Sequence, residues 1–166
     1  MRIYLVRHAD AVAQTPGNPD ASRHLSSGGR LSFRETARRL RDAGVRVSRI
    51  LSSPLVRAVQ TADILAEALE YEGEVQPHPR LGPGFDLEGL NELLDSFPEE
   101  TEIGLVGHEP DIGRIVSRLL ALPKGYAMPK GAVAAIALPD AGTRIRGGLE
   151  WIQAGDRRIV DPAELL

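Results

Sequence analysis

The chain has 166 residues, and its 20 lysines and arginines against 23 aspartates and glutamates give a formal net charge of −3. This length suits one domain, residues 1–166, with a sizeable hydrophobic core, and the mildly acidic balance argues against a broad basic surface for nucleic acid. There is no cysteine, which excludes disulfides, thiolate metal sites and cysteine nucleophiles.

The first apolar segment, residues 3–6, is short and is followed at once by Arg7 and His8. Such a run is too short for the core of a signal peptide and far too short for a membrane span. We therefore expect a cytoplasmic protein that does not act in a membrane.

The first half of the chain alternates between strand-like and helix-like patterns. Strands are expected at residues 3–6 and 49–51, with a helix between them from an N-cap at Ser26 to a C-terminal glycine at Gly44. Ser53 and Pro54 are typical of the N-cap and first turn of the next helix. We expect that helix to pack through an apolar stripe of alternating four- and three-residue spacing, namely Leu55, Val59, Ala62, Ala66 and Leu69.

The second half continues the alternation. The expected elements are a short strand at 75–77, a helix at 87–97, a strand at 103–106, a helix at 110–120 and two closing strands at 132–138 and 149–153. This order predicts an α/β fold, a three-layer α/β/α sandwich with a mostly parallel central sheet and a C-terminal antiparallel hairpin. Proline and glycine cluster in residues 15–22, 82–84 and 123–131, where we expect flexible loops.

Unusual polar residues follow three of the predicted strands. Arg7 and His8 end the first strand, Arg57 lies just after the second, and His108 follows the strand at 103–106. The carboxyl ends of parallel strands share one edge of a sheet, so these four side chains should lie close together. Arginines suit a polydentate oxyanion such as phosphate, and histidine can serve as a nucleophile or proton donor near neutral pH.

Four segments in this order carry a resemblance to a known family. They are Arg7-His8, Leu25-Ser26-Ser27-Gly28-Gly29, the block Ser-Ser-Pro-Leu-Val-Arg-Ala-Val-Gln-Thr-Ala at 52–62, and Val106-Gly107-His108. At these residues the sequence resembles the histidine phosphatase (phosphoglycerate mutase-like) superfamily. The short length and the order of elements look most like its SixA-type phosphohistidine phosphatases.

The resemblance implies a role for each of the four residues. His8 would be the nucleophile and become transiently phosphorylated, Arg7 and Arg57 would bind the phosphoryl oxygens, and His108 would complete the pocket and stabilise charge in the transition state. No metal or other cofactor is implied. One position departs from the family, because Ala9 stands where its members usually have glycine.

The nature of the substrate depends on the leaving group. Imidazole, whose conjugate acid has a pKa of about 6.5, leaves without help far more easily than an alkoxide. No residue aligns clearly with the family's general acid, so phosphohistidine on a phosphorelay or phosphotransfer protein is favoured. The alternatives are a small-molecule phosphomonoesterase with Asp86 or Glu88 as the general acid, and a module that binds phosphate without turnover.

Several other residues have two possible interpretations. Arg23 either contacts phosphate or substrate or lies in a solvated loop, and Lys130 either reaches the pocket rim or is a loop lysine. Asp10 is expected to face solvent or to pair with Arg7. No pair among the four histidines has metal-ligand spacing.

Overall fold

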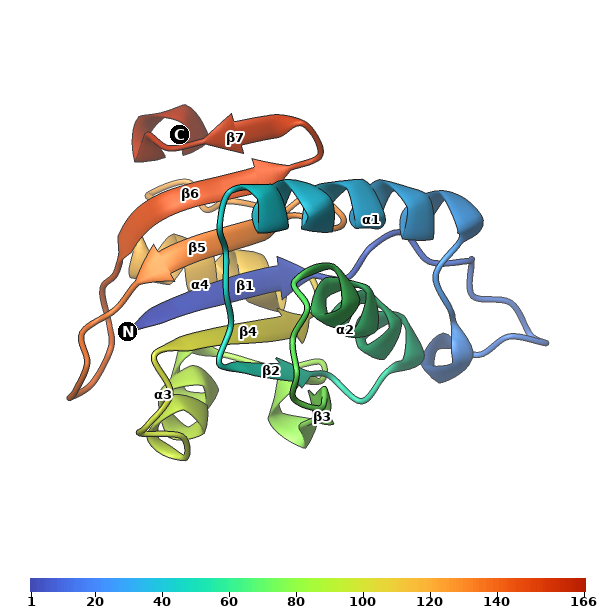
Figure 1. The fold of residues 1–166 in the computed structure, drawn as a ribbon, viewed down its shortest axis with the longest axis horizontal. Coiled ribbons are helices and arrows are strands. Elements are labelled where there is room, and N and C mark those ends of the chain that lie inside the picture. The colour runs from blue at the N-terminus through green and yellow to red at the C-terminus, as the bar shows by residue number, and fades with distance from the viewer.

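The computed structural model describes residues 1–166, and its centre is a seven-stranded sheet with the strand order β3-β2-β4-β1-β5-β6-β7 (Figure 1). The strands are β1 (Arg2–Arg7), β2 (Arg49–Ser52), β3 (Gln76–Pro77), β4 (Glu102–Gly107), β5 (Val133–Ala137), β6 (Gly148–Ala154) and β7 (Arg157–Ile159). Strands β1 to β4 pair in parallel, whereas β5, β6 and β7 add to β1 in antiparallel order.

Four α-helices connect and cover the strands. They are α1 (Ser27–Asp42), α2 (Val56–Ala68), α3 (Leu87–Asp95) and α4 (Asp111–Leu119). Figure 1 shows α1 and α2 in front of the sheet and α4 behind it. The predicted α/β/α sandwich and the hairpin of β5 and β6 are confirmed, while the short edge strand β7 was not predicted.

The alternation of side chains along β1 divides the core into two layers. Ile3 and Leu5 join the cluster under α3 and α4, whereas Tyr4 and Val6 join the cluster under α1 and α2. Both clusters are built mainly from fully buried aliphatic side chains. The two layers hold the parallel strands rigidly, which fixes the edge where their carboxyl ends meet. No helix combines the length and the apolar character needed to cross a membrane.

Helix α2 corrects two of the expectations. It begins at Val56, and Ser53 does not cap it, because the Ser53 hydroxyl accepts from the Leu55 amide in the turn before the helix. The predicted stripe is only partly right: Ala62 is fully buried and Ala66 and Leu69 pack against the cluster under α1 and α2, whereas Leu55 and Val59 belong to neither core cluster. The face that packs inward instead consists of Arg57, Ala58, Thr61, Ala62, Ile64 and Leu65. The two polar side chains of this face, Arg57 and Thr61, form hydrogen bonds with His8 and with the Ala9 amide.

Candidate active site

The predicted meeting of strand ends brings the two histidines together. Strands β1 and β4 are parallel neighbours in which Arg7 is paired with Gly107, so His8 and His108 follow at the same edge. Their ring centroids are 5.2 Å apart, and the two residues are only 9% and 5% exposed. Both imidazoles therefore lie side by side in a largely water-free environment.

The neighbours of His8 determine which ring nitrogen is free. Its Nδ1 lies 2.7 Å from the Ala9 carbonyl oxygen, and because a carbonyl only accepts, Nδ1 carries the hydrogen. The other nitrogen, Nε2, keeps its lone pair and accepts from Arg57 Nε at 3.3 Å. Burial above all, together with the positive charge of Arg57, lowers the pKa of His8 to about 4. At neutral pH the ring is uncharged, and Nε2 has the lone pair that a nucleophile needs.

Hydrogen bonds from helix α2 stabilise the turn after His8. The Ala9 amide donates to Thr61 Oγ1 at 3.1 Å, and the Thr61 hydroxyl donates to the Arg57 carbonyl at 2.8 Å. Gln60 accepts from the Leu25 amide at 2.7 Å. Of the polar side chains of this helix, only Arg57 was expected to act at the site. The sequence did place two polar residues, Gln60 and Thr61, three and four positions after Arg57, so that they lie near Arg57 on the same side of the helix.

Ala9 fits its position without backbone strain. Positive φ angles occur among non-glycine residues only at Glu70 and Ala121, so Ala9 does not need the conformation that glycine favours. Ala9 is 1% exposed and packs in the cluster under α1 and α2. The departure from the family pattern therefore leaves the turn that carries His8 intact.

Helix α1 packs tightly against the same turn. The Ser26 hydroxyl accepts from the Gly29 amide and donates to Asp10, which confirms Ser26 as the N-cap. A side-chain carbon on Gly29 would lie 2.2 Å from the Asp10 carbonyl oxygen, so only glycine permits this approach. This contact explains one glycine of the Leu-Ser-Ser-Gly-Gly segment.

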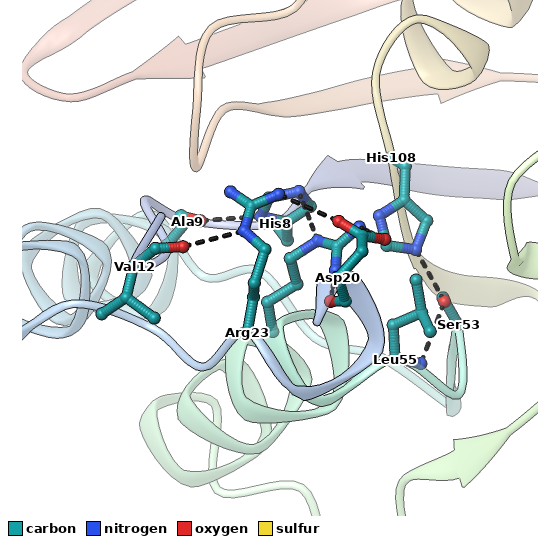
Figure 2. Close-up of polar contacts among 9 residues, drawn as sticks. His8, Ala9, Val12, Asp20, Arg23, Ser53, Leu55 and His108 are labelled. Atoms are coloured by element: carbon teal, nitrogen blue, oxygen red, sulfur yellow. Dashed lines mark hydrogen bonds and ion pairs between the residues drawn. The ribbon is translucent and has the colours of Figure 1, made fainter. Parts of the chain in front are cut away.

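Arg57 is buried and contacts Asp20, a residue for which the sequence indicated no role at the site. Its Nη1 donates to the Asp20 carbonyl at 2.8 Å, and its Nη2 lies 3.2 Å from the Asp20 carboxylate. The same carboxylate accepts from Arg23 Nη1 at 3.1 Å, while Arg23 Nε donates to the Val12 carbonyl (Figure 2). Arg23 therefore lies at the rim of the site, and the short 3₁₀ helix Asp20–Ser22, within the segment expected to be a loop, brings Asp20 and Arg23 together.

His108 completes the group from the other side. Its Nε2 lies 2.7 Å from the Ser53 hydroxyl, and its Nδ1 is buried with no hydrogen-bond partner. Burial is the main cause that lowers the pKa of His108 to about 4, with His8 and Arg57 adding to it and the Asp20 carboxylate opposing it. Figure 2 shows Asp20 between Arg23 and His108.

Arg7 reaches the loop at Met128 from the end of β1. Its Nη1 donates to the Met128 carbonyl at 2.7 Å, and its Nε is buried without a partner. Glu109, directly after His108, lies nearby and accepts from the Gly113 amide at 2.9 Å. Burial raises the pKa of this carboxyl, and the positive charge of Arg7 acts in the opposite direction. The Arg7 guanidinium thus adds positive charge to the environment of His8.

The remaining candidates lie at or beyond the rim. Lys130 Nζ forms a 2.7 Å ion pair with Asp10, so Asp10 pairs with Lys130 and not with Arg7. Asp86 caps α3 by accepting from the Gly89 amide at 2.8 Å, and Glu88 is exposed. Both line a groove between the start of α3 and α4, and neither forms a hydrogen bond or ion pair with His8 or His108. No group of three or more acidic or histidine side chains is arranged to hold a metal ion.

Comparisons with known proteins agree with this arrangement. The family model of the histidine phosphatase superfamily (branch 1) matches residues 3–105. Phosphohistidine phosphatase SixA of Escherichia coli (strain K12) is 26% identical over 153 residues, which cover 91% of this chain and 92% of that protein. An uncharacterized protein of a Picosynechococcus strain is 31% identical over 152 residues, covering 88% of this chain and 89% of its own length.

A solved structure shows the same fold. The structure of the protein histidine phosphatase SixA complexed with tungstate superposes with a TM-score of 0.82, covering 93% of this chain and 97% of that one at 24% identity. The family match spans more than half of the chain, and it includes the segments that carry His8 and Arg57. The chain therefore belongs to the histidine phosphatase superfamily and is a phosphatase of that superfamily.

Proposed function

We propose that the protein is a phosphohistidine phosphatase in which His8 is the nucleophile. The observation that carries this proposal is the fixed orientation of His8, whose Nδ1 hydrogen is held by the Ala9 carbonyl while Nε2 faces Arg57. A buried, uncharged imidazole with one free nitrogen is suited to attack phosphorus.

The surrounding residues have distinct roles in the proposed reaction. A bond forms between His8 Nε2 and phosphorus while the bond from phosphorus to the substrate imidazole breaks, and the leaving nitrogen takes a proton from water. A water molecule then attacks the phosphorylated His8, which releases inorganic phosphate and restores the free imidazole. Arg57 and Arg7 bind the phosphoryl oxygens, and His108 stabilises the charge that they carry in the transition state.

The environments of two carboxyl groups, Asp20 and Asp86, favour phosphohistidine over phosphate esters. Asp20 is the carboxylate in direct contact with Arg57, and hydrogen bonding from Arg23 is the largest cause that lowers its pKa. It is therefore ionised at neutral pH and a poor proton donor to an alkoxide. Asp86 is engaged at the N-terminus of α3. An imidazole leaving group does not need a strong acid, and the relative from E. coli is named for phosphohistidine. A phosphorylated histidine on a phosphorelay or phosphotransfer protein is the substrate we propose.

The experiment compares phosphohistidine on a phosphotransfer protein, phosphoserine and a sugar phosphate side by side. We expect turnover of phosphohistidine and acid-labile phosphate on the wild-type chain, with both lost in His8→Ala. His24→Ala is the matched control, because His24 is an exposed histidine of the loop before α1. Acid-labile phosphate that still appears on His8→Ala would show that His8 is not the nucleophile.

The other candidate functions predict different results. Comparable turnover of the sugar phosphate, lost in Asp86→Ala or Glu88→Ala, would favour the phosphomonoesterase. Phosphate binding without hydrolysis of any phosphoramidate would favour a binding module.

A further inference from the structure

We propose that Asp20 is an internal anion that competes with the phosphoryl group of the substrate, and with released inorganic phosphate, for Arg57 and Arg23. The inference rests on the proposed function, because it takes Arg57 as a phosphate-binding residue. It assigns Asp20 a role in setting the affinity of the site.

The contacts of Asp20 resemble those that an oxyanion would make. Its carboxylate bridges two guanidinium groups, with Oδ2 3.2 Å from Arg57 Nη2 and Oδ1 3.1 Å from Arg23 Nη1. Its backbone carbonyl accepts from Arg57 Nη1 at 2.8 Å. Guanidinium groups bind carboxylates and phosphates through the same pairs of N–H donors. A phosphoryl group that uses the terminal nitrogens of Arg57 therefore meets the negative charge of Asp20 at the same place.

Displacing Asp20 needs little loss of packing. Asp20 begins a one-turn 3₁₀ helix, Asp20–Ser22, which contains no buried residue. The Asp20 side chain is 44% exposed, whereas the Arg57 side chain to which it binds is 6% exposed. Segments that bury little apolar surface open at low free-energy cost. Arg57 is thus a fixed partner, and Asp20 is the partner able to move away.

The consequence concerns binding of the product. Phosphate carries more negative charge than the carboxylate, so it can displace Asp20. Its binding free energy is then less favourable than it would be at two arginines without a carboxylate partner. The returning carboxylate also favours release of phosphate after hydrolysis. If Asp20 instead only oriented Arg57, its removal would weaken phosphate binding, so the two roles predict opposite changes.

The test is calorimetric titration of the full-length chain with inorganic phosphate. Asp20→Asn removes the charge and keeps the size, and we expect it to bind phosphate about fivefold to tenfold more tightly, as loss of a partly exposed competing ion pair allows. Asp20→Ser should show the same direction. Asp95→Asn is the matched control, because Asp95 on α3 also pairs with a buried arginine, Arg144, at 2.8 Å. The phosphate affinity of Asp95→Asn should equal that of the wild type.

Unchanged or weaker phosphate binding by folded Asp20→Asn and Asp20→Ser would overturn the inference. Arg57→Ala should abolish the binding, and binding retained in that variant would refute both the site and the inference. Tighter binding by Asp20→Asn in a chain that hydrolyses no phosphohistidine would support the inference and refute only the proposed substrate.

Discussion

Thr61 offers the sharpest test of how helix α2 holds the nucleophile. Thr61 is fully buried, and its hydroxyl accepts from the Ala9 amide and donates to the Arg57 carbonyl. Thr61→Val keeps the shape of the side chain and removes the hydroxyl. The Ala9 amide is then buried without a partner, which costs about 1–3 kcal/mol. The Arg57 carbonyl lies within α2, so loss of its extra donor adds little.

The same substitution should lower activity, because the Ala9 carbonyl orients His8 Nδ1. We expect kcat on phosphohistidine to fall by about tenfold with little change in KM, as loss of preorganisation predicts. Thr61→Ser is the matched control, since it keeps both hydrogen bonds and loses one buried methyl group, worth about 1 kcal/mol.

Urea denaturation followed by circular dichroism and steady-state assays would measure both effects. The expected result for Thr61→Val is a lower urea midpoint at an unchanged slope. If Thr61→Val proves as stable and as active as Thr61→Ser, the Thr61 hydroxyl does not support the turn, and the reasoning fails.

Three other predictions concern the same edge of the sheet. Ala9→Gly should cost about 1–2 kcal/mol of stability through lost methyl burial and a more flexible unfolded chain, without raising activity; a gain in turnover would show that Ala9 strains the turn. Ser53→Ala leaves both ring nitrogens of His108 without a hydrogen-bond partner. Urea denaturation should show a free energy of unfolding lower by about 1–2 kcal/mol, and assays a lower kcat. A free energy of unfolding and a kcat equal to those of the wild type would contradict this prediction. Since the folded pKa values of His8 and His108 are lowered to about 4, the unfolded chain binds more protons between about pH 4 and 6.5. Stability is then complete above that range and is lost as the pH falls, by on the order of 2 kcal/mol per histidine from pH 7 to 5. Urea denaturation of His8→Ala should show a flatter pH dependence, and an unchanged one would contradict the assigned pKa.

The sequence alone predicted the elements whose signals are periodic. Helix α4 buries Ile112, Ile115, Val116 and Leu119, as their spacing indicates. Helix α1 buries Phe33, Ala37 and Leu40 in the same way. The convergence of His8 and His108 was also predictable, because parallel order alone places the ends of β1 and β4 at one edge.

Helix α2 shows what apolar periodicity does not predict. Its apolar pattern indicated one face, but the helix turns Arg57 and Thr61 inward as well. A buried arginine and a buried hydroxyl are stable only when they find partners, and those partners come from Asp20 and from the turn at Ala9. Spacing within a helix carries no information about partners on other segments.

The pattern of strands and helices along the chain was therefore enough to predict the sandwich and the meeting of His8, Arg57 and His108 at one edge of its sheet. The side chains that contact them are visible only in the folded chain, because Asp20 is 37 positions from Arg57 and Ser53 is 55 positions from His108. The reason is physical. Strand and helix signals depend on neighbours in the chain, whereas the partner of a buried donor depends on the path that a loop takes across the sheet edge.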